Sequence, residues 1–361
     1  MTANNTPEAF HPAQSGNQQP SGEVRNVGKR GMERRVNPIK SEGEDGLFTQ
    51  SWYAICLSSE VRPGEVIGRD FLDGRVVIFR GEDGKINVTS AYCPHVGADL
   101  AVGQVVGNDI QCAFHGWRYN ASGECVSTMF GSKPPQRACL FAYPVTERYG
   151  VVWVFNGEEP LWDIPKFEKN EDDLIFYAYK HQPAYKCDPW VFCCNTLDFQ
   201  HLIVIHGINV PQDAIDTLHD DVDWLDHGFD YRVATTHQGG VSLDWQLGIR
   251  GTSFYRQQGM YEDFWFGYIA GFSLPRPGLT DCYNIFAVEK GEDTPEGRAL
   301  AQKRLKMADD LEVRTIEEDR DVLDSIRLKP GNLIKVDTSM AKFYDYLRRY
   351  PRAHPGADFI K

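Results

Sequence analysis

Two short segments of the sequence each pair a cysteine with a histidine. Cys93 and His95 stand in the first segment, and Cys112 and His115 stand in the second. Written as spacing, this is Cys-x-His, sixteen residues, Cys-x-x-His. Two thiolates and two imidazoles, each pair on its own turn, can converge on one metal centre. These four residues are therefore candidate metal ligands.

Three interpretations of these pairs compete. The residues could gather by chance in a core, or they could hold a structural zinc ion. Common zinc sites pair cysteine with cysteine and histidine with histidine, whereas each segment here supplies one of each. The third interpretation is a [2Fe–2S] cluster with two cysteines on one iron and two histidines on the other. Such a cluster carries one electron and cannot by itself transform an organic substrate.

A second group of polar residues lies between positions 195 and 206. Asn195, Asp198 and His201 follow at three-residue steps, so we expect them to share one face of a helix. His206 stands five residues beyond His201, so a metal shared by both requires the helix to end or distort between them. Two histidines with open coordination positions fit the 2-His-1-carboxylate site of non-haem Fe(II) oxygenases.

A charged helix, expected from Thr294 to about Leu328, could supply the carboxylate of such a site. Its apolar residues recur along one side: Leu305, Ile316, Leu323 and Ile326. Asp319 points to the same side, where a carboxylate is costly unless it is paired or bound to a metal. Glu312 shares that face and is the alternative ligand. The neighbouring acidic residues are expected to be solvated: Glu317, Glu318 and Asp321.

The elements that position these residues indicate two domains after an N-terminal arm. Residues 1–46 are rich in polar residues, Gly and Pro, and are expected to be a disordered arm. Short β-rich runs separated by Gly-containing turns predict an all-β domain over residues 47–160. Alternating aromatic runs between residues 228 and 290 predict strands in the second domain, residues 161–361. The predicted fold class is α+β, with an antiparallel sheet flanked by helices in the second domain.

Many of the aromatic residues of the second half fall in these runs: Trp245, Phe254, Tyr255, Phe264, Trp265, Phe266, Tyr268 and Phe272. They could line an apolar cavity for a molecule that contains a ring. They could equally pack a sheet against helices, and the sequence leaves both interpretations open.

Composition limits the kind of partner. The chain has 361 residues and a formal net charge of −13, which argues against nucleic acid or an anionic membrane as partner. No run approaches the roughly 18 apolar residues of a membrane helix, and residues 1–19 lack the apolar core of a secretory signal. A cytoplasmic location is therefore expected. Nine cysteines at irregular spacing do not suggest a disulfide framework, so most are expected to be buried thiols.

The cysteine–histidine pairs resemble those of Rieske iron–sulfur proteins. Pro94, Gly97 and the pair Gly116-Trp117 strengthen the resemblance. With the pattern from Asn195 to His206, residues 47–330 resemble the Rieske non-haem iron aromatic-ring-hydroxylating oxygenases. The length and C-terminal pattern look closer to the single-chain hydroxylases and demethylases than to the longer dioxygenases.

The resemblance implies cofactors and roles. It places a [2Fe–2S] cluster on the two cysteine–histidine pairs and a mononuclear Fe(II) on His201, His206 and Asp319. It implies O₂ activation, a hydrophobic ring-containing substrate and a homotrimer, in which electrons cross between subunits. Asp198 occupies the family position that bridges a cluster histidine and an iron-ligand histidine, and Asn195 occupies the position of the neighbouring family asparagine.

The electrons must come from another protein. The sequence has neither a GxGxxG nucleotide fingerprint nor the C-x₄-C-x₂-C spacing of plant-type ferredoxins. A separate NAD(P)H-dependent reductase, with or without a ferredoxin, is therefore expected. Three alternatives stay open: a cis-dihydroxylating arene dioxygenase, a Rieske electron-transfer protein without mononuclear iron, and a zinc-stabilised binding module.

Overall fold

The structure is a computed structural model that describes residues 38–208, 217, 219–236, 242–328 and 332–361. Most of the expected N-terminal arm lies outside the described residues. Its last part, residues 38–46, is described, and Glu42 in it is buried and accepts hydrogen bonds from Thr49.

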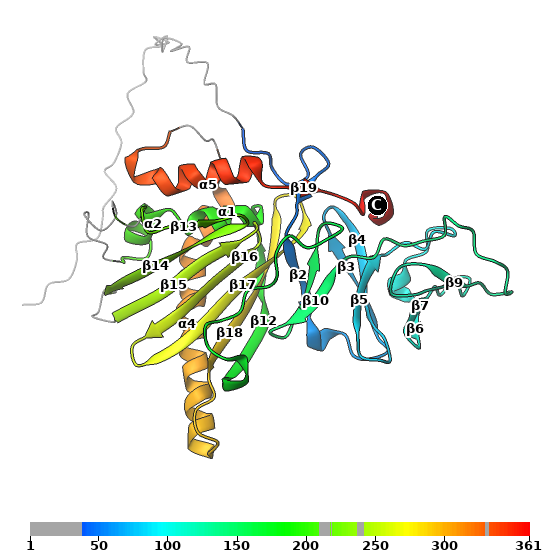
Figure 1. Cartoon of the computed structure of the whole chain (residues 1–361), viewed down its shortest axis with the longest axis horizontal. Helices are drawn as coiled ribbons and strands as arrows, with labels where there is room; N and C mark the ends of the chain where they lie inside the picture. Colours follow the sequence, from blue (N-terminus) through cyan, green and yellow to red (C-terminus); the bar gives the residue numbers. More distant parts are fainter. Residues whose placement is uncertain (1–37, 209–216, 218, 237–241, 329–331) are drawn as a thin grey trace, which may run out of the picture. The chain divides into compact units, whose positions relative to one another are not determined.

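Three small antiparallel sheets form the first part of the described chain (Figure 1). The first sheet has the order β10 (Val145–Arg148), β11 (Val151–Phe155) and β2 (Trp52–Leu57). The second has the order β3 (Val66–Phe71), β4 (Gly74–Arg80) and β5 (Ile86–Ser90). The third has the order β6 (Gln104–Val106), β7 (Asp109–Gln111), β8 (Arg118–Tyr119) and β9 (Cys125–Ser127). The predicted β-rich runs correspond to β2, β4, β5, β7 and β11. Gly84, Gly107 and Gly123 have positive φ, as the expected turns require.

A seven-stranded antiparallel sheet dominates the second part. Its order is β12 (Leu174–Tyr185), β18 (Leu279–Glu289), β17 (Phe264–Arg276), β16 (Phe254–Tyr261), β15 (Ser242–Arg250), β14 (Gly228–Thr236) and β13 (Asp223–Leu225). The alternating runs between residues 228 and 290 are strands, as predicted. Strand β12 had no counterpart in the sequence analysis. The strands before and after residue 160 belong to separate sheets, which supports the domain boundary that we propose there.

The helices are short except for one. They are α1 (Pro189–Asn195), α2 (Phe199–Val204), α4 (Pro295–Ser325), α5 (Thr338–Arg349) and α6 (Ala357–Ile360), with the 3₁₀ turns η1 (Ser58–Glu60), η2 (Leu100–Val102), η3 (Glu171–Asp173) and η4 (Lys335–Asp337). Strand β1 (Phe48–Thr49) pairs with β19 (Arg352–Ala353) near the C-terminus. Among the described residues, no helix combines the length and the apolar character needed to span a membrane.

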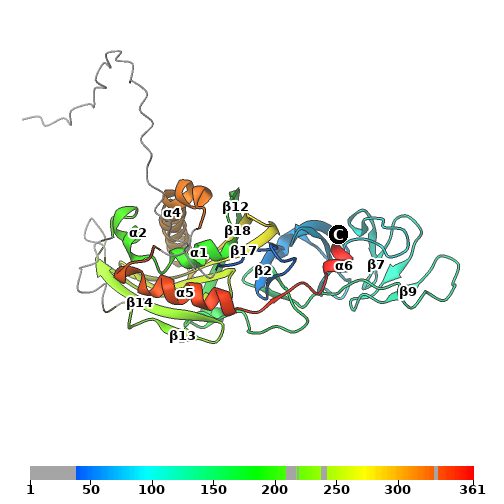
Figure 2. The same cartoon turned by 90° about the horizontal axis from the view of Figure 1, so that it is seen from above.

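The large sheet buries both of its faces. Helix α4 packs on β12, β17 and β18, and α1 also contacts β17 (Figures 1 and 2). Along β17, Phe266 and Tyr268 belong to the core that includes residues of α4. Trp265 and Ile269 alternate with them and pack with Trp153 of β11 in a different core. The predicted α+β class, with an antiparallel sheet flanked by helices, is confirmed.

Candidate active site

The two cysteine–histidine pairs lie on two loops with the same backbone turn. One loop follows β5 and the other joins β7 to β8. In each, the amide four residues after the cysteine donates to the cysteine carbonyl: Gly97 to Cys93 at 2.8 Å and Gly116 to Cys112 at 3.0 Å. Both glycines have positive φ, +83° and +68°, which side chains adopt only with strain. The glycines therefore give the two loops matching shapes.

The four side chains divide into a buried pair and a more exposed pair. Cys93 and Cys112 are both buried, and burial raises the pKa of the Cys93 thiol. The rings of His95 and His115 lie 4.6 Å apart at their centroids. His95 also stacks on the Trp117 indole at 4.3 Å, which orients its imidazole.

This donor set fits a Rieske cluster. Two buried sulfur atoms and two paired imidazoles nearer the surface match a cluster with one thiolate-bound and one histidine-bound iron. The Nδ1 atom of His115 is buried and has no hydrogen-bond partner among the described residues, so it needs one. Tyr119 was missed by the sequence analysis, and its hydroxyl lies 3.0 Å from Cys93 Sγ.

The segment from Asn195 to His206 is interrupted twice. Asn195 is the last residue of α1, and Asp198 caps a new helix, α2, where its Oδ1 accepts hydrogen bonds from the amides of Gln200 and His201. The expectation that Asn195, Asp198 and His201 share one face of a single helix is therefore wrong. The cause is the cap, because the Asp198 carboxylate binds the amides that begin α2. Helix α2 ends at Val204, so His206 lies beyond the helix, as a shared metal requires.

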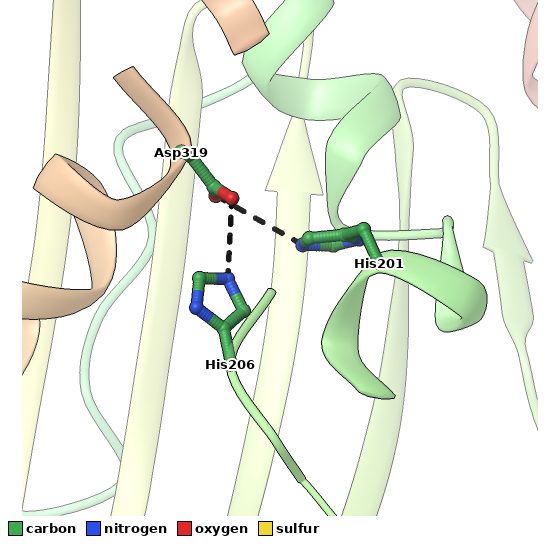
Figure 3. Close-up of side chains that lie close together, drawn as sticks. All are labelled: His201, His206 and Asp319. Atoms are coloured by element: carbon green, nitrogen blue, oxygen red, sulfur yellow. Dashed lines mark ion pairs between the residues drawn. The ribbon is translucent and has the colours of Figure 1, made fainter. Parts of the chain in front are cut away.

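The tertiary structure brings His201 and His206 to Asp319 of α4 (Figure 3). His206 Nε2 lies 3.4 Å from Asp319 Oδ1, and His201 Nε2 lies 3.9 Å from Asp319 Oδ2. One ligand atom from each of the three residues lies within 4.8 Å of the others. Ligands of one metal ion are roughly 3 to 4 Å apart, given metal–ligand bonds of about 2.1 Å. Asp319 is 7% exposed, and its buried Oδ1 has no hydrogen-bond partner among the described residues. The three side chains therefore fit a metal ion.

Both histidines are oriented by contacts on the opposite ring nitrogen. His201 Nδ1 donates to the backbone carbonyl of Asp198, and His206 Nδ1 donates to Glu318 Oε2 at 2.8 Å. A proton on Nδ1 leaves the Nε2 lone pair free, and in both rings Nε2 is the atom that faces Asp319. Burial lowers the pKa of His201 and so favours its neutral form. Burial also lowers the pKa of His206, but the carboxylates of Asp319 and Glu318 outweigh it, and the net shift is upward.

Glu317 and Glu318 are exposed, as expected, but each also has a hydrogen-bond partner. Glu318 hydrogen-bonds His206, while Glu317 binds His181 and Arg320. Helical periodicity could not predict these contacts, because both carboxylates remain about 40% exposed on α4 and find their partners on other elements. The position of Glu318 beside the candidate ligand Asp319 was the only signal in the sequence.

Asn195 joins the same group. Its Nδ2 donates to Asp319 Oδ2 at 2.9 Å and lies 3.2 Å from His201 Nε2. The amide therefore holds one oxygen of the candidate carboxylate ligand. Glu312, the alternative ligand, is buried but accepts a hydrogen bond from Gln257 at 2.7 Å instead of joining the two histidines.

A cavity of about 310 Å³ opens beside these residues. Its wall includes His201, His206 and Asp319 together with aromatic residues from the large sheet, among them Trp245, Tyr255 and Tyr268. Phe254 and Trp265 instead pack on the core at the opposite face of that sheet. Some of the aromatic residues therefore line a cavity and others pack the sheet, while binding of a ring-containing molecule stays a prediction.

Comparison with known proteins identifies the first domain. Residues 51–143 match the Rieske [2Fe-2S] domain. A cholesterol 7-desaturase of Bombyx mori is 33% identical over 172 residues, which cover 46% of this chain and 37% of the relative. A probable 3-ketosteroid-9-alpha-monooxygenase oxygenase component of Rhodococcus rhodochrous is 31% identical over 164 residues, 45% of this chain and 39% of the relative. The chain therefore contains a Rieske [2Fe-2S] domain and is similar over part of its length to Rieske oxygenases.

The likeness of fold extends beyond the Rieske domain. The match to the solved structure of NdmB from Pseudomonas putida CBB5 has a TM-score of 0.61 at 18% identity and covers 82% of this chain and 89% of that chain. The matched Rieske [2Fe-2S] domain confirms the predicted cluster. The mononuclear iron stays a prediction, which the geometry of His201, His206 and Asp319 supports. The match spans less than half the length of either curated relative.

Proposed function

We propose that this protein is a Rieske oxygenase, which uses O₂ to hydroxylate or oxidatively demethylate a hydrophobic substrate that contains a ring. Its electrons come from a separate NAD(P)H-dependent reductase, directly or through a ferredoxin. The observation that carries the proposal is the convergence of His201, His206 and Asp319 at the wall of a largely apolar cavity. The names of relatives include a probable ketosteroid monooxygenase and a vanillate O-demethylase, which supports both reaction types.

Two groups of residues hold the cofactors in this proposal. Cys93, His95, Cys112 and His115 bind the [2Fe–2S] cluster, and His201, His206 and Asp319 bind the mononuclear iron. When bound, the cluster supplies single electrons and the ferrous iron activates O₂.

The chain's own residues prepare the site for this chemistry. Asn195 holds Asp319 through its Oδ2, and Glu318 holds His206 through its Nδ1, so the ligand atoms are oriented before a metal binds. The aromatic wall receives the apolar substrate and excludes water from the reacting centre.

Electron transfer is proposed to cross between subunits of a homotrimer. Asp198 uses Oδ1 to cap α2, and its Oδ2 has no hydrogen-bond partner within the described parts of the chain. We assign this oxygen to a bridge from His201 to a cluster histidine of a neighbouring subunit. Apolar side chains are exposed beside the cluster histidines, at Val96 and Phe114, and on α2 at Val204. Exposed apolar patches of this kind are typical of contact surfaces.

Iron content tests the assignment of the two centres. We expect three irons per chain in the reconstituted protein, because a cluster holds two and the mononuclear site holds one. Asp319→Ala should retain two irons with an unchanged cluster spectrum, whereas Glu312→Ala should retain three. Two irons in the unaltered protein would instead support an electron carrier, and a colourless protein would support a zinc module.

Product analysis tests the reaction. A panel of ring-containing substrates is incubated with a reductase, NADH and ¹⁸O-labelled O₂, and the products are followed by mass spectrometry. Incorporation of one labelled oxygen, or loss of a methyl group as formaldehyde, is the expected result. Incorporation of two labelled oxygens as a cis-diol would identify the dioxygenase alternative, and no product from any substrate would contradict the proposal.

A further inference from the structure

Apart from the candidate iron ligand Asp319, Glu312 is the only buried acidic residue among the described residues that line the cavity. Glu312 is 5% exposed, lines the cavity and accepts a hydrogen bond from Gln257 Nε2 at 2.7 Å. Gln257 is itself buried and accepts a hydrogen bond from the Tyr255 hydroxyl through Oε1. Tyr255, Gln257 and Glu312 thus form a chain of hydrogen bonds that ends on the Glu312 carboxyl group.

The second oxygen of Glu312 is left for another partner. In the described part of the chain, Gln257 is the only residue that hydrogen-bonds the Glu312 side chain, and it engages Oε1. Burial raises the pKa of Glu312 to about 8, so at neutral pH the carboxyl group is mostly protonated and can donate as well as accept. A substrate that displaces water from this end of the cavity must supply a hydrogen bond to Oε2, because a polar atom that loses water without a new partner is costly.

Helix α4 sets the distance between this group and the candidate iron ligand. Glu312 precedes Asp319 by seven residues, which is two helical turns and about 10 Å along the axis. Both side chains therefore lie on the same side of α4, and Ile316 lines the cavity between them. Along α4, the wall of the cavity therefore runs from the candidate iron ligand Asp319, past the apolar Ile316, to Glu312 at the polar end.

We propose that Glu312, held by Gln257, recognises an uncharged oxygen function of the substrate, a hydroxyl or carbonyl group. This group lies across the ring system from the carbon that reacts. The inference rests on the proposed oxygenase function, since it concerns the substrate of the same site.

The charges of the wall disfavour a substrate anion at the polar end. Apart from the two histidines, Arg314 is the only basic residue among the described residues that line the cavity, and it is exposed. A carboxylate placed against Glu312 would lose its hydration without a buried cation to compensate. A neutral oxygen function satisfies Glu312 without that cost.

Binding to the holoenzyme, measured by equilibrium dialysis without O₂ or reductant, tests this directly. The probes are biphenyl, 4-hydroxybiphenyl, 2-hydroxybiphenyl and biphenyl-4-carboxylate. In Glu312→Leu we expect the preference for 4-hydroxybiphenyl over biphenyl to fall roughly tenfold, the effect of one buried hydrogen bond. The affinity for 2-hydroxybiphenyl, whose hydroxyl lies beside the ring junction, should change much less.

Two further variants serve as controls. Glu312→Gln retains a hydrogen-bonding side chain of the same size and should keep most of the preference, which separates recognition from a folding defect. Arg314→Gln should leave the affinity for 4-hydroxybiphenyl unchanged. Iron content and the cluster spectrum are measured for each variant, so that only protein with both centres is compared.

The inference is overturned if Glu312→Leu leaves the preference intact or if 4-hydroxybiphenyl does not bind up to its solubility limit. It is also overturned if biphenyl-4-carboxylate binds most tightly and loses that affinity in Arg314→Gln. Failure of the proposed function looks different. In that case the probes bind with the expected selectivity, but no substrate yields an oxygenated product with O₂ and a reductase.

Discussion

His206 and Asp319 face each other at 3.4 Å, Nε2 to Oδ1, although one follows the end of α2 and the other lies within the long helix α4. The other ring nitrogen of His206 is bound to Glu318, the residue that precedes Asp319. One turn of α4 therefore supplies both the proposed carboxylate ligand and the group that orients a histidine ligand.

Removing the Glu318 carboxylate should weaken the mononuclear site. In Glu318→Ala, His206 loses its partner on Nδ1, so we expect iron affinity to fall roughly 10- to 100-fold while the cluster is retained. The matched control is Glu317→Ala, because Glu317 is equally exposed on α4 but binds His181 and Arg320. Iron content after dialysis against a chelator measures the effect. Equal loss of iron in both variants would contradict this role of Glu318.

Asp198→Asn should impair electron transfer without changing the structure. Asparagine caps helices as well as aspartate does, so α2 and both iron centres should be preserved. Most of the turnover should be lost, because the proposed bridge requires the negative charge of Asp198. Iron content tests whether both centres are preserved. The rate at which the reduced cluster is reoxidised in the presence of substrate and O₂ tests electron transfer. Turnover at the unaltered rate would exclude the bridge.

Tyr119→Phe should lower the reduction potential of the cluster. The Tyr119 hydroxyl lies 3.0 Å from Cys93 Sγ, and a hydrogen bond to a cluster sulfur stabilises the reduced, more negative state. A hydrogen bond worth about 1 kcal/mol corresponds to roughly 40 mV for one electron. Redox titration followed by circular dichroism measures the shift. Tyr143→Phe is the control, because its buried hydroxyl has no partner among the described residues, and an equal shift there would refute the prediction.

Glu42→Gln should change how stability depends on pH. Burial raises the pKa of Glu42 to about 7, with Asp188 adding to the shift and Arg352 opposing it. The folded state therefore binds this proton more tightly than the unfolded state, whose pKa is near 4.5. The stabilising contribution is complete below about pH 4.5 and is lost as the pH rises to about 7, by about 3 kcal/mol in total.

The measurement for Glu42 is the difference in free energy of unfolding between the two proteins, from denaturant titrations at pH 5 and pH 8. Glutamine does not titrate, so the unaltered protein should lose stability relative to Glu42→Gln as the pH rises. Glu44→Gln provides a control at an exposed position nearby. The same pH dependence in the unaltered protein and in Glu42→Gln would show that Glu42 is not the titrating group.

Much of the architecture was accessible from local patterns. Aromatic residues alternate along the segments between residues 228 and 290, and apolar residues form a stripe along α4. Both patterns are visible in the sequence because they depend only on which side chains face the core. Strand β12 was missed, since it lies at the edge of the sheet, its one partner strand β18 is far away in the sequence, and its own alternation is weak. The break between α1 and α2 was missed because it depends on a single side-chain cap at Asp198.

The sequence by itself determined the chemistry available to this protein: two cysteine–histidine pairs at Rieske spacing, two further histidines, and a carboxylate turned inward on a helix. Tertiary structure alone decided which groups meet. Only the packing of α4 against the large sheet brings Asp319, Glu318 and Glu312 to His201, His206 and Gln257. The periodicity of side chains along an element indicates the face on which each residue lies. Which residue of another element it contacts depends on how the two elements pack, and the local sequence does not determine that packing.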